Sequence, residues 1–122
     1  MVRITLGALQ HAIMKVLWAR GEAASSEVHK ALLRERGLAP TTIATMLRKM
    51  EDKGVVEHRA EGRQFLYRAT VSEAEVQTSM VDDLVGRLFA GDPAALVSHL
   101  INNEQIDSEE INKLRKLLEK NQ

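Results

Sequence analysis

The stretch that decides the fold is "APTTIATMLRKMEDKG", Ala39 to Gly54. Proline suits the first position of a helix, because its missing N–H would have no partner there, and glycine commonly ends one. Helix propensity does not explain three threonines in the first two turns, since β-branched residues are indifferent helix formers. We infer that something outside the helix selected them. Helical spacing also predicts an inward apolar stripe, made of Ile43, Met46, Leu47 and Met50.

Two further helices are expected before this stretch. The segment "LGALQHAIMKVLWARG", Leu6 to Gly21, predicts one helix that ends at its glycine. Its inward face is expected to hold Leu6, Leu9, Ile13, Val16 and Leu17. The segment "SSEVHKALLRERG", Ser25 to Gly37, predicts a second helix of about three turns, with Ser25 or Ser26 as its N-cap. Its expected buried residues are Val28, Leu32 and Leu33.

After Gly54 the hydrophobic period changes from helical to alternating. The segment "VVEHRAEGRQFLYRA", 55–69, predicts two short strands joined around Glu61, Gly62 and Arg63. The residues expected to point inward are Val56, Phe65 and Tyr67. Three helices followed by a hairpin form the order of a winged helix-turn-helix, whose third helix enters the major groove of DNA.

This order explains the threonines of the third helix. If the apolar stripe is buried, the opposite face presents small polar and basic side chains. A threonine hydroxyl can bond to a base edge and its methyl can pack on the methyl of thymine, while arginine and lysine reach phosphates. A single threonine at a helix start more often forms a hydrogen bond with the unpaired backbone groups there. The combination of threonines, basic residues and a basic hairpin nevertheless favours DNA binding. The expected DNA-binding set is Thr41, Thr42, Thr45, Arg48, Lys49, Lys53, Arg59 and Arg63.

The charge distribution supports this interpretation. The chain has 122 residues, 28% of them charged, and no net charge. Residues 1–70 hold 12 Lys and Arg against 7 Asp and Glu, whereas residues 71–122 hold 5 against 10, so the two parts carry +5 and −5. A basic part is suited to a polyanion.

Other chemistry finds little support in the sequence. There is no cysteine, so neither a disulfide nor a thiolate metal site is available. The four histidines have no metal-binding spacing, and there is no glycine-rich phosphate loop. We therefore expect no metal, no cofactor and no enzymatic activity. No signal peptide and no membrane-spanning stretch is recognisable, so we expect a cytoplasmic protein without membrane insertion.

Residues 71–122 predict three more helices with apolar stripes. The second of them is expected to start at Asp92-Pro93, and the third at a capping box made of Asp107 and Glu110. These 52 residues contain only one aromatic residue, which is too little apolar volume for a hydrophobic core of their own. A second copy of the chain is therefore expected to cover the stripes. The alternative is that they pack on the winged helix. The expected dimerisation set is Val76, Met80, Leu84, Leu88, Leu96, Leu100, Ile111, Leu114, Leu117 and Leu118.

The expected fold class is therefore mainly α with a small β-hairpin. Residues 1–70 are predicted to form a winged-helix DNA-binding domain, and residues 71–122 a three-helix dimerisation domain.

Four segments together resemble the BlaI/MecI penicillinase-repressor family: "IMKVLWARG" at 13–21, "EVHKAL" at 27–32, "APTTIATMLRKMEDKGVV" at 39–56 and "EGRQFLYRA" at 61–69. The resemblance implies a homodimeric winged-helix repressor that binds inverted repeats of double-stranded DNA overlapping promoters. It also implies a β-lactam or related stress regulon. The residues that match DNA-facing positions of the family are Thr41, Thr42, Thr45 and Lys49.

The resemblance also implies a third partner, a membrane-bound β-lactam sensor that triggers cleavage of the repressor. In the best-known members the cut lies at an Asn-Phe bond, and the matching pair here is His99-Leu100. A protease pocket shaped for asparagine is expected to discriminate against a bulkier histidine ring that titrates near neutral pH. A related copper-sensing branch uses cysteine pairs, which this chain lacks.

Two alternatives stay open at this point. One is a winged-helix adaptor that binds protein instead of DNA, because a fold does not dictate its partner. The other is a repressor of the same fold that a small-molecule ligand releases from DNA without proteolysis.

Overall fold

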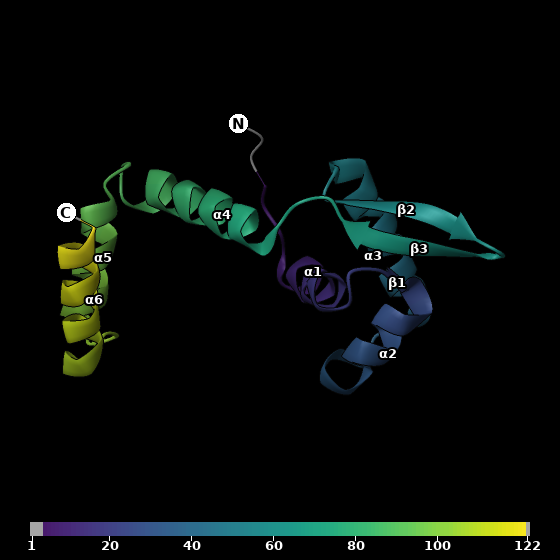
Figure 1. Ribbon diagram of the computed structural model, residues 1–122, viewed down its shortest axis with the longest axis horizontal. Helices are drawn as coiled ribbons and strands as arrows, with labels where there is room; N and C mark the ends of the chain where they lie inside the picture. The colour runs from purple at the N-terminus through teal and green to yellow at the C-terminus, as the bar shows by residue number, and fades with distance from the viewer. Residues whose placement is uncertain (1–3, 122) are drawn as a thin grey trace. The chain divides into compact units, whose positions relative to one another are not determined.

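A computed structural model describes residues 4–121 of the chain (Figure 1). The chain divides into two compact units, Met1–Met80 and Val81–Gln122. The molecule is mainly helical with one small antiparallel sheet, as the sequence predicts.

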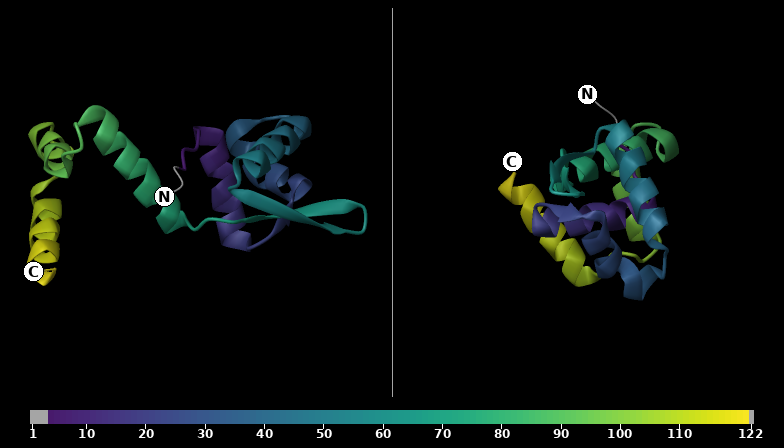
Figure 2. Two further views of the ribbon diagram at one scale, coloured as in Figure 1. Left: turned by 90° about the horizontal axis from the view of Figure 1, so that it is seen from above. Right: turned by 90° about the vertical axis from the view of Figure 1, so that its right-hand side faces the viewer.

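The first unit has the winged helix-turn-helix order. Its elements are α1 (Ala8–Arg20), β1 (Ala23–Ala24), α2 (Ser25–Arg36), α3 (Pro40–Lys53), β2 (Val56–Glu61) and β3 (Gln64–Ala69), followed by the first part of α4 (Glu73–Leu88). The antiparallel sheet has the order β1-β3-β2, so β3 is its central strand. The hairpin of β2 and β3, here called the wing, projects beyond the three helices (Figure 2).

One hydrophobic core joins the helices to the base of the wing. The side chains that are less than 2% exposed come from α1, β1, α2, α3, β2 and α4, and those of the helices lie on their periodic apolar stripes. From α3 the core receives three residues of the predicted stripe, Ile43, Leu47 and Met50, and Met46 packs against it half-buried. Met14 of α1, which the predicted stripe omitted, is fully buried.

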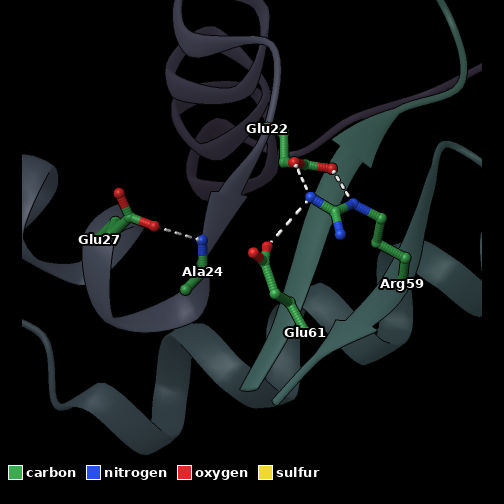
Figure 3. A network of polar contacts seen from close by, with 5 residues as sticks. All are labelled: Glu22, Ala24, Glu27, Arg59 and Glu61. Carbon is green, nitrogen blue, oxygen red and sulfur yellow. Dashed lines mark hydrogen bonds and ion pairs between the residues drawn. The ribbon is translucent and has the colours of Figure 1, made fainter. Parts of the chain in front are cut away.

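The predicted N-cap of α2 is wrong. Ala24 occupies the N-cap position with an extended backbone, because β1 runs directly into the helix. Neither Ser25 nor Ser26 caps the helix; instead the Glu27 carboxylate accepts a hydrogen bond from the Ala24 N–H at 2.9 Å (Figure 3). A strand of two alanines carries no alternating pattern, so β1 could not be predicted from hydrophobic periodicity.

Two predicted core residues lie at the surface. Phe65, expected to point inward, is 51% exposed because it pairs with Ala60 near the wing tip, beyond the cover of the helices. Leu66, which the predicted inward residues do not include, is buried on the other face of the sheet, opposite Ala24 of β1 and Arg59 of β2. Leu33 of α2 is 49% exposed, so its predicted burial is also wrong.

The helix ends after the wing follow the local sequence. Helix α5 (Pro93–Asn102) starts after Asp92, whose carboxylate accepts a hydrogen bond from the Ala94 N–H at 3.0 Å. Helix α6 (Ser108–Lys120) starts with the predicted capping box: Asp107 accepts from the Glu110 N–H at 2.8 Å, and Glu110 accepts from the Asp107 N–H at 3.3 Å. Both predicted helix starts are confirmed.

The packing boundary between the units falls inside α4. Val76 is 2% exposed in the core of the first unit, and Met80 packs against that core. The Ser79 hydroxyl accepts a hydrogen bond from the Ile4 N–H at 2.7 Å. The sequence predicts Val76 at a dimer interface. It is instead a core residue of the winged helix, because the first turns of α4 pack against the core of the first unit. The functional division at 70/71 stays a prediction.

No single helix among residues 4–121 has the length and apolar character needed to cross a membrane; α4 and α5 meet that test only when taken together as a bent pair.

Candidate nucleic-acid interface

The outer face of α3 presents the predicted threonines and basic residues. Because the opposite stripe is buried, Thr41, Thr45, Arg48 and Lys49 are exposed, and Thr42 is half-buried. Among the side chains that the structure describes, no carboxylate forms an ion pair with Arg48 or Lys49. A helix with hydroxyl, methyl and uncompensated cationic groups on one face has the chemistry for base edges and phosphates.

Lys53 has a different environment from the rest of the set. It lies 12 residues after Thr41, about 18 Å along the helix at 1.5 Å per residue. Its ammonium donates hydrogen bonds to the Thr5 carbonyl at 2.7 Å and to the Gln10 Oε1 at 3.2 Å. Lys53 therefore fastens the segment before α1 to the end of α3.

The wing tip is a two-residue turn with one basic side chain. Glu61 pairs with Gln64, and Gly62 between them has a φ of 62°, a left-handed conformation that favours glycine. Arg63 is exposed at this turn, and no described carboxylate pairs with it. The tip therefore offers a free guanidinium beyond the body of the first unit.

The other predicted wing arginine is engaged within the protein. Arg59 donates two hydrogen bonds to the Glu22 carboxylate, at 2.7 and 2.9 Å, and one to Glu61 at 3.1 Å (Figure 3). The hydrogen bond from Arg59 lowers the pKa of the Glu22 carboxyl, and the same bond raises the pKa of Arg59. Arg68 is bound in the same way to Glu57.

A groove of about 500 Å³ lies between α3 and the wing, here called the α3–wing groove. At its centre the His58 Nδ1 lies 2.5 Å from the Glu51 Oε2, and the His58 ring packs on Phe65 with centroids 4.3 Å apart. Burial raises the pKa of Tyr67 in its wall, and Glu51 adds to that effect. The lining residues that are not in the predicted DNA-binding set are Ala24, Ser25, Ser26, Ala44, Glu51, His58, Gln64, Phe65 and Tyr67.

The alternation of side chains along the two predicted strands could have identified the wing residues of this groove. His58, Phe65 and Tyr67 lie on one face of the sheet, because side chains alternate along a strand and paired residues share a face. The sequence could not reveal that this face meets Glu51 of α3, since that contact depends on the tertiary packing.

The comparisons with known proteins agree with this geometry. The penicillinase repressor family matches residues 6–120. The penicillinase repressor of Bacillus licheniformis is 33% identical over 107 residues, which cover 88% of this chain and 84% of that protein. The chain belongs to the penicillinase repressor family. This is the family that the sequence resembles, and it comprises DNA-binding repressors, so the protein is a regulator and not an enzyme.

Two further relatives support the membership. The methicillin resistance regulatory protein MecI of Staphylococcus aureus is 21% identical over 108 residues, covering 88% of each chain. A solved structure of the Bacillus licheniformis BlaI monomer in complex with the blaP half-operator is 31% identical, with a TM-score of 0.53. It covers 61% of this chain and 90% of that chain.

The second unit of this family member exposes much of its apolar surface. On α4 and α6 the predicted stripes are open: Leu84 is 41% exposed, Leu88 71% and Leu118 69%. Leu114 and Leu117 are also exposed, whereas Leu96, Leu100 and Ile111 are half-buried. The exposed leucines are therefore open to solvent in the single chain, and the rest of the dimerisation set stays a prediction.

His99 and Leu100, the pair expected from the resemblance to match a cleavage site, lie within α5. His99 is exposed and its ring packs edge-on against Phe89, with centroids 5.7 Å apart. Its carbonyl accepts hydrogen bonds from the backbone N–H and the side chain of Asn103. The peptide bond between His99 and Leu100 therefore lies inside the helix, and Asn103 at the C-terminal end of α5 is hydrogen-bonded to the His99 carbonyl.

Among residues 4–121, no group of three or more histidine, aspartate or glutamate side chains is arranged to hold a metal ion.

Proposed function

We propose that this member of the penicillinase repressor family is a homodimeric repressor that binds an inverted-repeat operator in the cytoplasm. The observation that carries the proposal is the outer face of α3, where Thr41, Thr45, Arg48 and Lys49 are exposed without an acidic partner among the described side chains. Arg63 at the wing tip adds a second contact on the same unit. Thr42 lies at the edge of this face. A relative of 31% identity binds a half-operator, which supports DNA as the partner.

The α3 helix is proposed to read the bases and the wing tip to bind phosphate. The first turns of a recognition helix lie nearest to base edges, so Thr41, Thr42 and Thr45 supply the specific contacts. Arg48, Lys49 and Arg63 supply charge, which holds the protein in register on the duplex. Lys53 is left out of the proposed contacts, because its ammonium already bonds to Thr5 and Gln10.

The second copy is proposed to bind through the exposed apolar surface of the second unit. Leu84 and Leu88 on α4 and Leu114, Leu117 and Leu118 on α6 are the main candidates. Covering them would remove apolar area from water, which stabilises association by about 25 cal/mol per Å² before the entropic cost of association. A two-fold dimer presents two α3 helices, and this is why the operator should be an inverted repeat.

Selection of bound duplexes from a randomised DNA pool by the full-length protein tests the proposal. The expected product is an inverted repeat that binds much more tightly than random DNA, with an affinity that falls steeply as salt rises. Weak binding without sequence preference would exclude a specific repressor. If this chain binds no duplex but binds a partner protein, the adaptor alternative is supported.

The inducing signal is proposed from the relatives. The names of the relatives, penicillinase repressor and methicillin resistance regulatory protein, point to β-lactam response genes as the regulated set. A membrane sensor protease is proposed as a partner only from the resemblance of the sequence to the family. Inspection of neighbouring genes tests this part: an adjacent membrane metalloprotease with a penicillin-binding sensor domain supports it, and an unrelated neighbour favours another regulon.

A cavity in the first unit favours a second route of induction, by a small molecule. It has a volume of about 650 Å³, within the range of ligand pockets, and lies where α3 ends and α4 begins. Its walls include Val55, Val71 and Ala74, with Lys53 and Thr78 among the polar groups. A ligand here would contact α4, the helix that continues into the second unit. Release of the operator by a small molecule without loss of full-length protein would support this route over proteolysis.

A further inference from the structure

The two faces of the wing sheet differ in chemistry. Residues that pair across strands share a face, so Ala24, Leu66 and Arg59 lie on one side, and His58 and Tyr67 on the other. The His58 side contacts Glu51 of α3 and forms the α3–wing groove. Arg59 therefore lies on the opposite side of the sheet, here called the outer face of the wing.

Charged side chains cover an apolar residue on this outer face. Leu66 is only 8% exposed there, and it lines a hollow together with Glu22, Glu57, His58, Arg59 and Arg68. The aliphatic stems of arginine can cover apolar surface while their charged ends stay in water. The four charges form two ion pairs, Glu22 with Arg59 and Glu57 with Arg68, so the outer face has little net charge to offer a polyanion.

The two ion pairs differ in what they connect. Glu57 and Arg68 are direct partners in β2 and β3, which the turn at Gly62 already joins. Glu22 instead precedes β1, and its bonds to Arg59 reach across the sheet to its far strand, 37 residues later in the chain. The backbone link between β1 and the wing is short, since only Ala23 and Ala24 pair with β3.

We propose that the Glu22–Arg59 pair positions the wing relative to the helices, and that Arg59 is not a contact to DNA. The proposal rests on the proposed function, since wing position matters only if the tip binds DNA. The pair joins the segment between α1 and α2 to β2, the strand that leads into the tip turn at Arg63. Loss of the pair leaves the short β1 pairing, the core at the base of the wing and the His58–Glu51 contact to hold the sheet, so the tip moves more freely and binds less well.

Replacement of Glu22 by alanine distinguishes a positioning role of Arg59 from a phosphate contact, because the two roles predict opposite changes in DNA affinity. If Arg59 positions the wing, Glu22→Ala weakens binding to the duplex selected by the native protein several-fold. If Arg59 instead binds phosphate, removal of its carboxylate partner frees a cation and tightens binding. Unchanged or tighter binding by Glu22→Ala overturns the proposal.

A charge exchange tests the same pair without removing it. Arg59→Glu alone places a carboxylate beside those of Glu22 and Glu61 and should weaken binding, whereas adding Glu22→Arg should restore most of the lost affinity. A phosphate contact by Arg59 would not be restored in this way. Persistent weakness of the double variant, with the native thermal midpoint, therefore counts against a positioning role.

Arg68→Ala is the matched control, because it breaks the pair that lies within the hairpin. We expect it to change affinity much less than Glu22→Ala. Amide hydrogen exchange supplies a readout that needs no DNA: protection of the β1–β3 pair at Ala23 and Tyr67 should fall in Glu22→Ala and persist in Arg68→Ala, whereas the Ala24 amide reports its own bond to Glu27. Native protein that binds no duplex would refute the proposed function, and unchanged exchange in Glu22→Ala would refute the positioning role separately.

Discussion

Thr45 illustrates how the environment of one side chain defines its role. It is exposed on α3, on the face opposite the buried Ile43, Leu47 and Met50, and threonine has only a modest helix propensity. A threonine that fills no core and caps no helix end is free to contact a base edge. Its hydroxyl and methyl suit thymine, with which both groups can interact.

We expect Thr45→Ala to weaken binding to the selected operator by about 1–3 kcal/mol, the usual value of one base contact. Binding to random DNA should change little, because no base is read there. Competition titrations with both duplexes measure the difference. Equal losses on the two duplexes would remove Thr45 from the base contacts.

Arg63 should behave differently, because a phosphate contact carries no sequence information. Arg63→Ala is expected to weaken operator and random DNA by similar factors and to reduce the salt slope of binding by about 0.9. Titrations at several salt concentrations measure this slope. A slope equal to that of the native protein would show that the wing tip makes no phosphate contact.

Helix α4 runs through the boundary between the two units, and its first turns pack in the winged helix. Val76 is buried there and Ser79 accepts the hydrogen bond from Ile4. A chain ending at Met80 should therefore fold as a monomer. A chain ending at Val71 loses the buried Val76 side chain, which corresponds to about 1.5–3 kcal/mol of apolar burial, and should be clearly less stable. Thermal unfolding and sedimentation of the two chains check both statements; equal stability would show that α4 is dispensable for the first unit.

Helix α5 determines how accessible the His99-Leu100 bond is to a protease. The bond lies inside the helix, and Asn103 bonds back to the His99 carbonyl, so cleavage requires local opening. Histidine in place of asparagine should also fit a family-type pocket poorly. We therefore expect no cut at this bond when the native host is exposed to a β-lactam. Immunoblotting before and after exposure tests this, and a fragment ending at His99 would contradict it.

The whole molecule should act on DNA as a pair of chains. Two weak half-site contacts become strong when they are linked, by factors of about 10² to 10⁴. The exposed apolar residues of α4 and α6 are the proposed link. The centres of the two half-sites should lie one helical turn of DNA apart, about 34–36 Å, or a multiple of it, which footprinting measures.

Leu88→Glu tests the proposed dimer surface with little risk to the fold. Leu88 is 71% exposed, so a charge there barely affects the single chain but would be buried in a dimer. We expect a monomer in sedimentation and a loss of most operator affinity. Ser98→Glu, at an exposed polar position of α5, is the control and should remain dimeric. A dimeric Leu88→Glu protein would place the interface elsewhere.

Sequence alone determined those features that depend on residues close together in the chain. The span of α3 follows from Pro40, Gly54 and the apolar stripe between them, and the starts of α5 and α6 follow from Asp92 and Asp107. Burial of that stripe also decides which face of α3 is exposed. These features are local, because helix caps and helical periodicity act over a few residues.

Only the tertiary structure decided which partners distant residues find. Arg59 and Arg63 look alike in the sequence, but one bonds to Glu22, 37 residues away, and the other is exposed at the tip. Val76 belongs to the same periodic stripe as Leu84, yet it is buried in the first unit while Leu84 is exposed. Periodicity identifies an apolar face without naming what covers it. The order of the strands and the packing of α4 supply that information, since they bring together segments that the chain keeps far apart.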